Sequence, residues 1–371
     1  MFNKSLNSII YISNVGYKQH ASNASINRIR AVQKGCLKLG TNCELFFLYP
    51  KDKFNFFESI FFPFFSIWNM LMKTKKGDVV IFYGNSLYIL LLFFFRKKIK
   101  FYVERTEYPY YMINKGKKIS KSAVLKEKLS NYVLNHVEGL ITCSSALKEF
   151  YSKYIDSEKI LIIPFIVDVE KFSKKETKSI FTFEYIAYCG SFNNNKDGLP
   201  ILIKSFANIS SRFPYLKLVI IGGGSKPVEN KIKTLVKDLK IENKVVFTGV
   251  IAHDEMPNYL CNAKVLALAR PNNKQAEGGI PSKVGEYLST GIPTVVTNVG
   301  ELSLFLENRV NCIMVEPDSV TSFSSGLEEA LLSVNAIEMG SKAKETVKRF
   351  SPIAQADRLI NFIIHRNIKS E

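Results

Sequence analysis

The chain has 371 residues, of which 46% are hydrophobic and 23% are charged, and this composition excludes a disordered protein. A chain of this length exceeds one ordinary core and predicts two domains. The formal net charge of +18 is uneven: residues 1–172 hold 26 lysines and arginines against 13 acidic residues, whereas residues 173–371 hold 25 against 20. An anionic partner is therefore expected on the first half of the chain.

Six cysteines lie scattered through apolar runs without the paired spacing of metal sites, which predicts reduced thiols in a cytoplasmic protein. The apolar run at the start of the sequence is too short for a signal peptide. Residues 79–95 form the longest apolar block, but Gly84, Asn85 and Ser86 interrupt it. We expect a buried strand, a polar turn and a buried helix there rather than a membrane span.

Apolar runs typical of buried parallel strands alternate with helical patterns along the first half of the chain. The expected strands are residues 8–13, 43–49, 78–83, 99–104, 138–144 and 159–164. A helix is expected from about 22 to 39, where Gly40 ends it. This alternation predicts a parallel sheet with helices on both faces, and hence a first Rossmann-like domain over residues 1–172.

A polar stretch at 173–179 is the expected linker, and the same pattern restarts after it. The expected strands are residues 183–190, 216–224, 244–249, 264–269, 294–299 and 311–317. Helices are expected near 199–212, 226–240 and 281–288, and residues 271–280 are expected to form a loop. The sequence thus predicts a second domain over 180–350 and a last segment, 352–371, whose helix crosses back to the first domain.

Doubly wound sheets bind ligands outside the carboxyl ends of their strands, so the loops that follow strands are the places to search. The segment 277–291 is the most informative of them. Pro281 opens a helix whose first turn presents backbone N–H groups, and Gly278 and Gly279 let an anion approach that backbone closely. A phosphate site is expected there, with Glu286 accepting hydrogen bonds from a ribose diol. The alternative is an ordinary turn whose glycines serve only packing.

Other loops after strands add candidates of the same kind. Gly190 and Ser191 follow the first strand of the second domain, Lys196 follows them as a point charge for a pyrophosphate, and Gly223 follows the second strand. Lys283 is expected either to join the anion site or to point to solvent. In the first domain, Asn14, Gly16 and Arg28 take the corresponding position on the acceptor side, with plain turn chemistry and a solvated basic helix as the alternative.

The segments "GGIPSKVGEYLSTGIPTVVTNVGE", "YCGSFNNNKDG", "LKLVIIGGG" and "ILIIPFIVDVEKF" resemble the GT-B nucleotide-sugar transferases of glycosyltransferase family 4. The resemblance covers nearly the whole chain and is most specific from about 160 to 320. It implies an α/β protein of GT-B fold, with two Rossmann-like doubly wound parallel-sheet domains facing a central cleft. It also implies retaining transfer from a nucleotide-diphosphate sugar, often to a lipid-linked or polysaccharide acceptor, without a metal or other cofactor.

By position, the resemblance assigns the ribose to Glu286, the phosphates to Lys196, and the nucleobase to the turn at Gly249 and Val250. It assigns the backbone near the diphosphate to three successive residues, Gly278, Gly279 and Ile280. The family's sugar-binding glutamate stands eight positions before the ribose-binding one, where this chain has Gly278, so Glu277 is the candidate for that role. Ser191 replaces an arginine that many members carry.

The first domain lacks the family's usual histidine. The corresponding loop reads "VERTEYP", so Arg105 and Glu107 are the catalytic-side candidates there. Residues 54–76 combine phenylalanines, the only tryptophan and a basic end, and residues 115–128 add further cations. Together they predict a peripheral protein on the inner face of the cell membrane, with an anionic lipid surface and a lipid-linked acceptor as partners. A core helix with a solvated basic loop is the alternative.

The expected function is therefore glycosyl transfer from a UDP- or GDP-linked sugar in surface polysaccharide or glycoconjugate synthesis. Two alternatives remain open. One is a GT-B epimerase that acts on a nucleotide sugar. The other is a basic nucleic-acid-binding α/β protein, which the calculated pI of 9.4 suggests and no recognisable nucleic-acid-binding motif supports.

Overall fold

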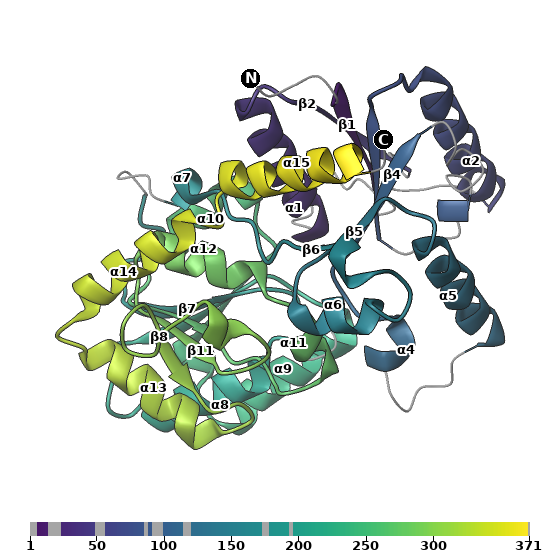
Figure 1. Cartoon of the computed structure of the whole chain (residues 1–371). Coiled ribbons are helices and arrows are strands. Elements are labelled where there is room, and N and C mark those ends of the chain that lie inside the picture. Colours follow the sequence, from purple (N-terminus) through teal and green to yellow (C-terminus); the bar gives the residue numbers. More distant parts are fainter. Residues whose placement is uncertain are drawn as a thin grey trace. The chain divides into compact units, whose positions relative to one another are not determined.

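The computed structural model describes residues 6–13, 24–48, 56–84, 88–90, 99–113, 120–172, 178–192 and 196–369. The chain divides into two compact units, one formed by Met1–Ile166 with Phe350–Glu371 and the other by Val167–Arg349. Each unit is an α/β domain with a six-stranded parallel sheet flanked by helices (Figure 1). The doubly wound α/β fold expected from the sequence is confirmed.

The first sheet has the strand order β2-β1-β3-β4-β5-β6. Its strands are β1 (Ser8–Ser13), β2 (Asn42–Phe47), β3 (Val79–Tyr83), β4 (Lys100–Arg105), β5 (Gly139–Thr142) and β6 (Ile160–Ile162). Its helices are α1 (Ala24–Lys38), α2 (Phe56–Lys73), α4 (Tyr110–Ile113), α5 (Lys121–Leu134), α6 (Ser145–Tyr151) and α15 (Pro352–Lys369). All six strands fall where the apolar runs predicted them, within a few residues.

Two apolar cores cover the two faces of the first sheet. Ile67 and Leu71 of α2, Val133 and Leu134 of α5, and Leu147 of α6 pack with one set of strand residues. On the other face, α1 and α15 pack with the alternate set, and α15 lies along α1 (Figure 1). This alternation is what a pleated strand with both faces buried requires.

The second sheet has the order β12-β11-β10-β7-β8-β9, which is the doubly wound order with its switch point between β7 and β10. Its strands are β7 (Tyr185–Cys189), β8 (Lys217–Ile221), β9 (Val245–Gly249), β10 (Val265–Leu268), β11 (Thr294–Thr297) and β12 (Ile313–Val315). Its helices are α7 (Val169–Phe172), α8 (Leu199–Ile209), α9 (Lys226–Asp238), α10 (Met256–Leu260), α11 (Lys274–Gly278), α12 (Ser282–Thr290), α13 (Val320–Leu332) and α14 (Ala336–Lys348).

Three local findings differ from the sequence expectations. Residues 274–278, expected as loop, form the short helix α11, because the Asn273 side chain accepts a hydrogen bond from the backbone N–H of Ala276 and caps it (2.9 Å). Residues 167–172, expected in the first domain, belong to the second unit as α7. Of the expected turn and helix after β3, residues 85–87 and 91–98 lie outside the described part of the chain. The six cysteines are free thiols, and all but Cys261 are buried.

Candidate active site

The carboxyl ends of β10, β7, β8 and β9 stand next to one another in the second sheet, so the segments that leave them share one edge. Glycines let these segments pack backbone against backbone. Gly222 has a φ of +124°, and a Cβ atom there would collide with the carbonyl oxygen of Gly190. Gly198 has a φ of +65°, and its Cβ would collide with the carbonyl oxygen of Ala269. Glycine is thus required at both crossings.

A charged cluster lies at the exit of β7. Asp197 is 3% exposed, accepts a hydrogen bond from the hydroxyl of Tyr188 (3.0 Å), and forms an ion pair with the ammonium of Lys283 on α12. Burial raises the pKa of the Asp197 carboxyl, but the charges of Lys283 and Arg270 and the two hydrogen bonds outweigh it, so the pKa is lowered overall. Asp197 is therefore ionised and fixes Lys283 beside Gly190, rather than in solvent.

Arg270 leaves β10 as a fully buried charge. Its guanidinium donates to the carbonyl oxygen of Gly279 (2.7 Å), and its own carbonyl oxygen accepts from the hydroxyl of Thr297 (2.7 Å). Arg270 therefore holds the α11–α12 connection against the end of the sheet. Neither Arg270 nor Asp197 was predicted from the sequence. For Arg270 the available signal was a charged residue close behind an apolar strand, whereas Asp197 lies far along the loop after β7 and gave no such signal.

The N-terminus of α12 follows this connection. Pro281 is the residue before the helix, and the backbone N–H groups of the first turn have no acceptor within the helix. The helix ends at Gly291 with a φ of +75°, which confirms the predicted left-handed stop. The hydroxyl of Tyr287 accepts a hydrogen bond from the backbone N–H of Cys189 (2.8 Å), so the helix is fixed to the end of β7. These features make the start of α12 suitable for an anion.

Glu286 lies one turn into α12 and is half-buried. Burial raises the pKa of its carboxyl to about 7, although the nearby charges of Lys283 and Lys171 lower it. Within the described part of the chain, no hydrogen-bond donor reaches this carboxylate. A pair of hydroxyl groups on a ligand would supply such donors.

Gly223 and Val250 meet at the neighbouring exits of β8 and β9. A Cβ at Gly223 would lie 3.5 Å from Cγ2 of Val250, and the Glu229 carboxylate accepts from the backbone N–H of Gly224 (3.0 Å). Val250 is exposed, as is Ser191 after β7. Lys196, in the same loop as Asp197, is half-buried. Seven of the expected donor residues thus occupy one edge of the second sheet: Gly190, Ser191, Lys196, Gly223, Val250, Lys283 and Glu286.

The remaining donor-side candidates lie in and after α11. Gly278 is the last residue of α11 and is buried, Gly279 is its C-cap, and Ile280 leads into α12. Glu277 is exposed on α11 and forms an ion pair with Lys274 (2.6 Å). Glu277 is therefore part of a capped helical turn, where the sequence predicted a loop.

The first-domain candidates have a different character. The guanidinium of Arg28 forms an ion pair with the buried carboxylate of Glu104 (2.6 Å) and donates to the carbonyl oxygens of Ile163 and Pro164. The other oxygen of Glu104 accepts from the hydroxyl of Tyr11 (2.9 Å). Arg28 thus ties α1 to β4 and to the segment after β6, so it is not the solvated cation of the alternative interpretation, and its acceptor-side role stays a prediction.

Arg105 points into the first domain. It is buried, its guanidinium donates to the hydroxyl of Ser130 (2.5 Å), and it lies 3.7 Å from the Glu127 carboxylate on α5. Arg105 therefore makes structural contacts within the first domain, and its catalytic contact stays a prediction. Glu107 is exposed after β4, and Asn14 and Gly16 lie outside the described residues.

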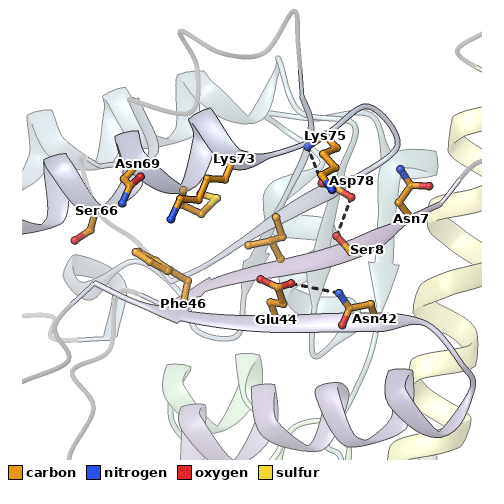
Figure 2. Close-up of a pocket in the computed structure, with 12 residues that line it drawn as sticks. Asn7, Ser8, Asn42, Glu44, Phe46, Ser66, Asn69, Lys73, Lys75 and Asp78 are labelled. Atoms are coloured by element: carbon orange, nitrogen blue, oxygen red, sulfur yellow. Dashed lines mark hydrogen bonds between the residues drawn. The ribbon is translucent and has the colours of Figure 1, made fainter.

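A cavity of about 670 Å³ lies in the first domain between α2 and the starts of the strands (Figure 2). Ser8 begins β1, Asn42 begins β2 and Asp78 precedes β3, so the cavity is at the amino ends of the strands. Asp78 accepts from the hydroxyl of Ser8 (2.8 Å) and from the backbone N–H of Lys75 (2.7 Å). This is the edge opposite to the one at which doubly wound sheets bind ligands.

The described residues contain no group of three or more histidine, cysteine, aspartate or glutamate side chains arranged to hold a metal ion.

Residues 184–333 match the family model described as "Glycosyl transferases group 1". Solved structures share the architecture over almost the whole chain. A glycosyltransferase from Rickettsia africae superposes with a TM-score of 0.74 at 15% identity and covers 97% of this chain and 99% of its own. The protein has the GT-B fold. The Anabaena protein HepE, solved with UDP and glucose, has a TM-score of 0.72 at 12% identity and covers 97% and 100%.

Among relatives of known name, the chain is similar to the "GDP-mannose-dependent alpha-(1-6)-phosphatidylinositol monomannoside mannosyltransferase" of Mycobacterium tuberculosis. The two are 27% identical over 157 residues, which is 41% of this chain and 40% of the relative. The alignment thus spans about two fifths of that enzyme. The enzyme class indicated by the domain match and by this relative is glycosyltransferase.

Proposed function

We propose that the chain is a retaining glycosyltransferase that moves a sugar from a nucleotide-diphosphate sugar to a glycan acceptor, with a lipid-diphosphate carrier as the preferred form. One observation carries the proposal. Four strand exits of the second sheet meet around the start of α12, where backbone N–H groups, Lys283 and the half-buried Glu286 lie within one domain. The glycosyltransferase family model matches this same domain.

In this proposal the donor diphosphate lies at the N-terminus of α12. The first-turn amides, Lys283 and Lys196 stabilise its charge, and Gly190 and Gly279 leave room for its approach. Glu286 accepts hydrogen bonds from the ribose hydroxyls, and Gly223 and Val250 contact the base. HepE was solved with UDP, and the mycobacterial relative is named for GDP-mannose, so UDP and GDP are the two nucleoside diphosphates to test.

The reaction breaks the bond between the sugar C1 and the β-phosphate oxygen and forms a bond between C1 and an acceptor hydroxyl oxygen. The acceptor proton passes to the departing diphosphate. Because negative charge develops on the leaving group, preorganised cations and amides lower the barrier most. We propose that these groups replace a metal ion, and that Glu277 orients the donor sugar after leaving its ion pair with Lys274.

The acceptor belongs to the first domain in this proposal, with Glu107 as the exposed acidic candidate. The excess of positive charge in residues 1–172 suits an acceptor that carries a diphosphate and a membrane with anionic lipids. The mycobacterial relative is named for a phosphatidylinositol acceptor, which supports a lipid-linked substrate. We therefore propose a peripheral enzyme on the inner face of the cell membrane, in surface polysaccharide or glycoconjugate synthesis.

Calorimetry with UDP, GDP and an RNA oligomer tests the donor site, with Glu286→Gln as the variant. We expect one nucleoside diphosphate to bind the parent and the variant to bind it at least tenfold more weakly. Mass spectrometry of products from a panel of nucleotide sugars and a lipid-diphosphate acceptor then tests the reaction, and NMR of the anomeric proton tests retention. Binding of RNA alone, or product formation that requires a metal ion, would contradict the proposal.

A further inference from the structure

The outer side of α2 is an apolar surface in a domain rich in positive charge. Phe61, Phe65, Trp68 and Met72 repeat at helical spacing, and Phe65 is 63%, Trp68 49% and Met72 67% exposed. Phe64 stacks on Trp68, with ring centroids 6.5 Å apart and an interplanar angle of 14°. Soluble monomers rarely leave an aromatic surface of this kind uncovered.

The other two sides of α2 are accounted for. Pro63, Ile67 and Leu71 are buried, and the last two belong to the core beneath the helix. Ser66, Asn69 and Lys73 line the cavity next to β2, whose wall also carries Glu44 and Asp78 (Figure 2). The helix therefore directs its polar residues toward the cavity and its aromatic residues away from the domain, so neither the core nor the cavity explains the aromatic side.

A second helix on the same face of the sheet repeats the pattern. Leu125, Leu129 and Tyr132 are exposed at helical spacing on α5, and Val133 and Leu134 of α5 enter the same core as α2. Both helices cover one face of the sheet, so their outer sides turn away from that same face. Each of the two helices therefore carries a row of exposed apolar side chains on its outer side.

Exposed cations border this apolar surface. Lys76 is exposed just after α2, and Lys121 and Lys128 are exposed on α5; Lys73 and Lys75 line the cavity instead. Apolar side chains bordered by lysines suit an interface that is hydrocarbon inside and anionic at its rim. A protein partner of ordinary composition would not need this combination.

We propose that the outer sides of α2 and α5 form a docking surface for an anionic lipid bilayer. Phe61, Phe65, Trp68 and Met72 enter the acyl boundary, and the flanking lysines contact the lipid phosphates. Neither helix crosses the bilayer: among the described residues, no helix is long and apolar enough to do so. This inference names the surface through which the proposed peripheral enzyme would contact the membrane. It rests on the proposed function only for its biological role, since lipid binding itself does not require sugar transfer.

Trp68 makes the proposal directly measurable because it is the only tryptophan in the chain. Vesicles of phosphatidylcholine and phosphatidylglycerol in equal parts are added to the full chain at low salt, and the tryptophan emission is recorded. We expect a shift to shorter wavelength, quenching by brominated lipids, and at least tenfold weaker partition into pure phosphatidylcholine vesicles. Protein that floats with the anionic vesicles while the Trp68 emission stays unchanged would overturn the assigned surface.

Two variants distinguish lipid binding by this surface from non-specific adsorption of the protein to vesicles. Phe65→Gln with Met72→Gln removes apolar contact but keeps helix-forming residues, and we expect it to lower the partition coefficient at least tenfold. The matched control is Ile337→Gln on α14 of the second domain, where the side chain is 91% exposed, and it should leave partition unchanged. Equal partition of the double variant and the parent would overturn the proposal.

Two further measurements show whether a negative result concerns the docking surface, the donor site or the folding of the variant. Circular dichroism and nucleoside diphosphate calorimetry on the double variant should equal the parent, since the substituted side chains are exposed and lie outside the donor domain. Normal vesicle binding with no nucleotide binding would refute the donor site and leave the docking surface intact. A dimer that the double variant dissociates, without any vesicle binding by the parent, would identify the surface as a contact between two copies and overturn lipid docking.

Discussion

The carboxyl edges of the two sheets use charge in opposite ways. In the first domain, Arg28 and Glu104 pair with each other, and Arg105 packs against Glu127 and Ser130. In the second domain, Lys283 is held by Asp197 at a helix N-terminus, close to the half-buried Glu286. The role of a charged residue after a strand therefore depends on its partners. An ion pair enclosed by carbonyl groups and core side chains stabilises the fold. An ion pair beside backbone amides and glycines is accessible to a ligand.

The largest expected effect on stability is in the first domain. Arg28→Met leaves Glu104 as an unpaired buried carboxylate and removes two hydrogen bonds to carbonyl oxygens, so we expect a loss of about 3–5 kcal/mol in the free energy of unfolding. Urea denaturation measures it. Adding Glu104→Leu should restore part of the loss, and nucleoside diphosphate affinity of the folded variant should not change. If Arg28→Met lowered nucleoside diphosphate affinity without lowering stability, Arg28 would not be a purely structural residue.

Lys283→Met should combine both kinds of effect. It leaves Asp197 buried without its ammonium partner, so we expect a loss of about 3 kcal/mol in the free energy of unfolding and weaker binding of the diphosphate. Adding Asp197→Asn should recover stability but not nucleotide affinity. Denaturation and calorimetry on the single and double variants separate the two contributions. Recovery of both properties would assign Lys283 to structure alone.

Turnover measurements test the edge of the second sheet through its chemistry rather than through folding. We expect Lys196→Ala and Glu286→Ala each to raise the barrier by about 2.7–4 kcal/mol, because each removes a positioned contact to the donor. Initial rates with a nucleotide sugar measure the effect, and the melting temperature serves as the control. Near-normal turnover of both variants with an unchanged melting temperature would reject the assigned donor site.

A dependence of stability on pH is also expected. The pKa of Glu286 is raised to about 7, so the folded protein holds a proton that the unfolded chain releases at lower pH. Stability contributed by this group is therefore lost as the pH rises toward 7. Glu286→Gln should raise the free energy of unfolding by up to about 3 kcal/mol at pH of roughly 8 and leave it unchanged below about pH 4. Denaturation at the two pH values checks this; an equal gain at both would rule out titration as the cause.

Much of the fold follows from sequence pattern. Strands buried on both faces read as continuous apolar runs, so β3 and β8 could be found without any structural information. The start and stop of α12 were predictable as well, since Pro281 and Gly291 have fixed backbone preferences. Local rules of this kind depend on a few neighbouring residues and transfer well.

The partners of charged side chains did not follow from the sequence. Asp197 and Lys283 are 86 positions apart, and Arg28 meets the carbonyl of Pro164 across 136 positions. Arg105 and Lys196 look alike as basic residues in loops after strands, yet Arg105 is buried against α5 and Lys196 is only half-buried. Only the packing of the helices decides which of the two is enclosed. The short helix α11 was missed because its Asn273 cap was read as loop.

The first domain is built from two separate stretches of the chain, with the second domain between them. Ala356, Leu359, Ile360 and Ile363 of α15 complete the core that begins with β1 and α1, and the Phe350 ring lies 4.2 Å from that of Phe165. During translation, the second domain can fold as soon as residues 167–349 have left the ribosome. The first domain must wait for the last helix, so a truncated nascent chain would leave one side of α1 bare. The first domain can therefore be completed only after the second domain has been synthesised.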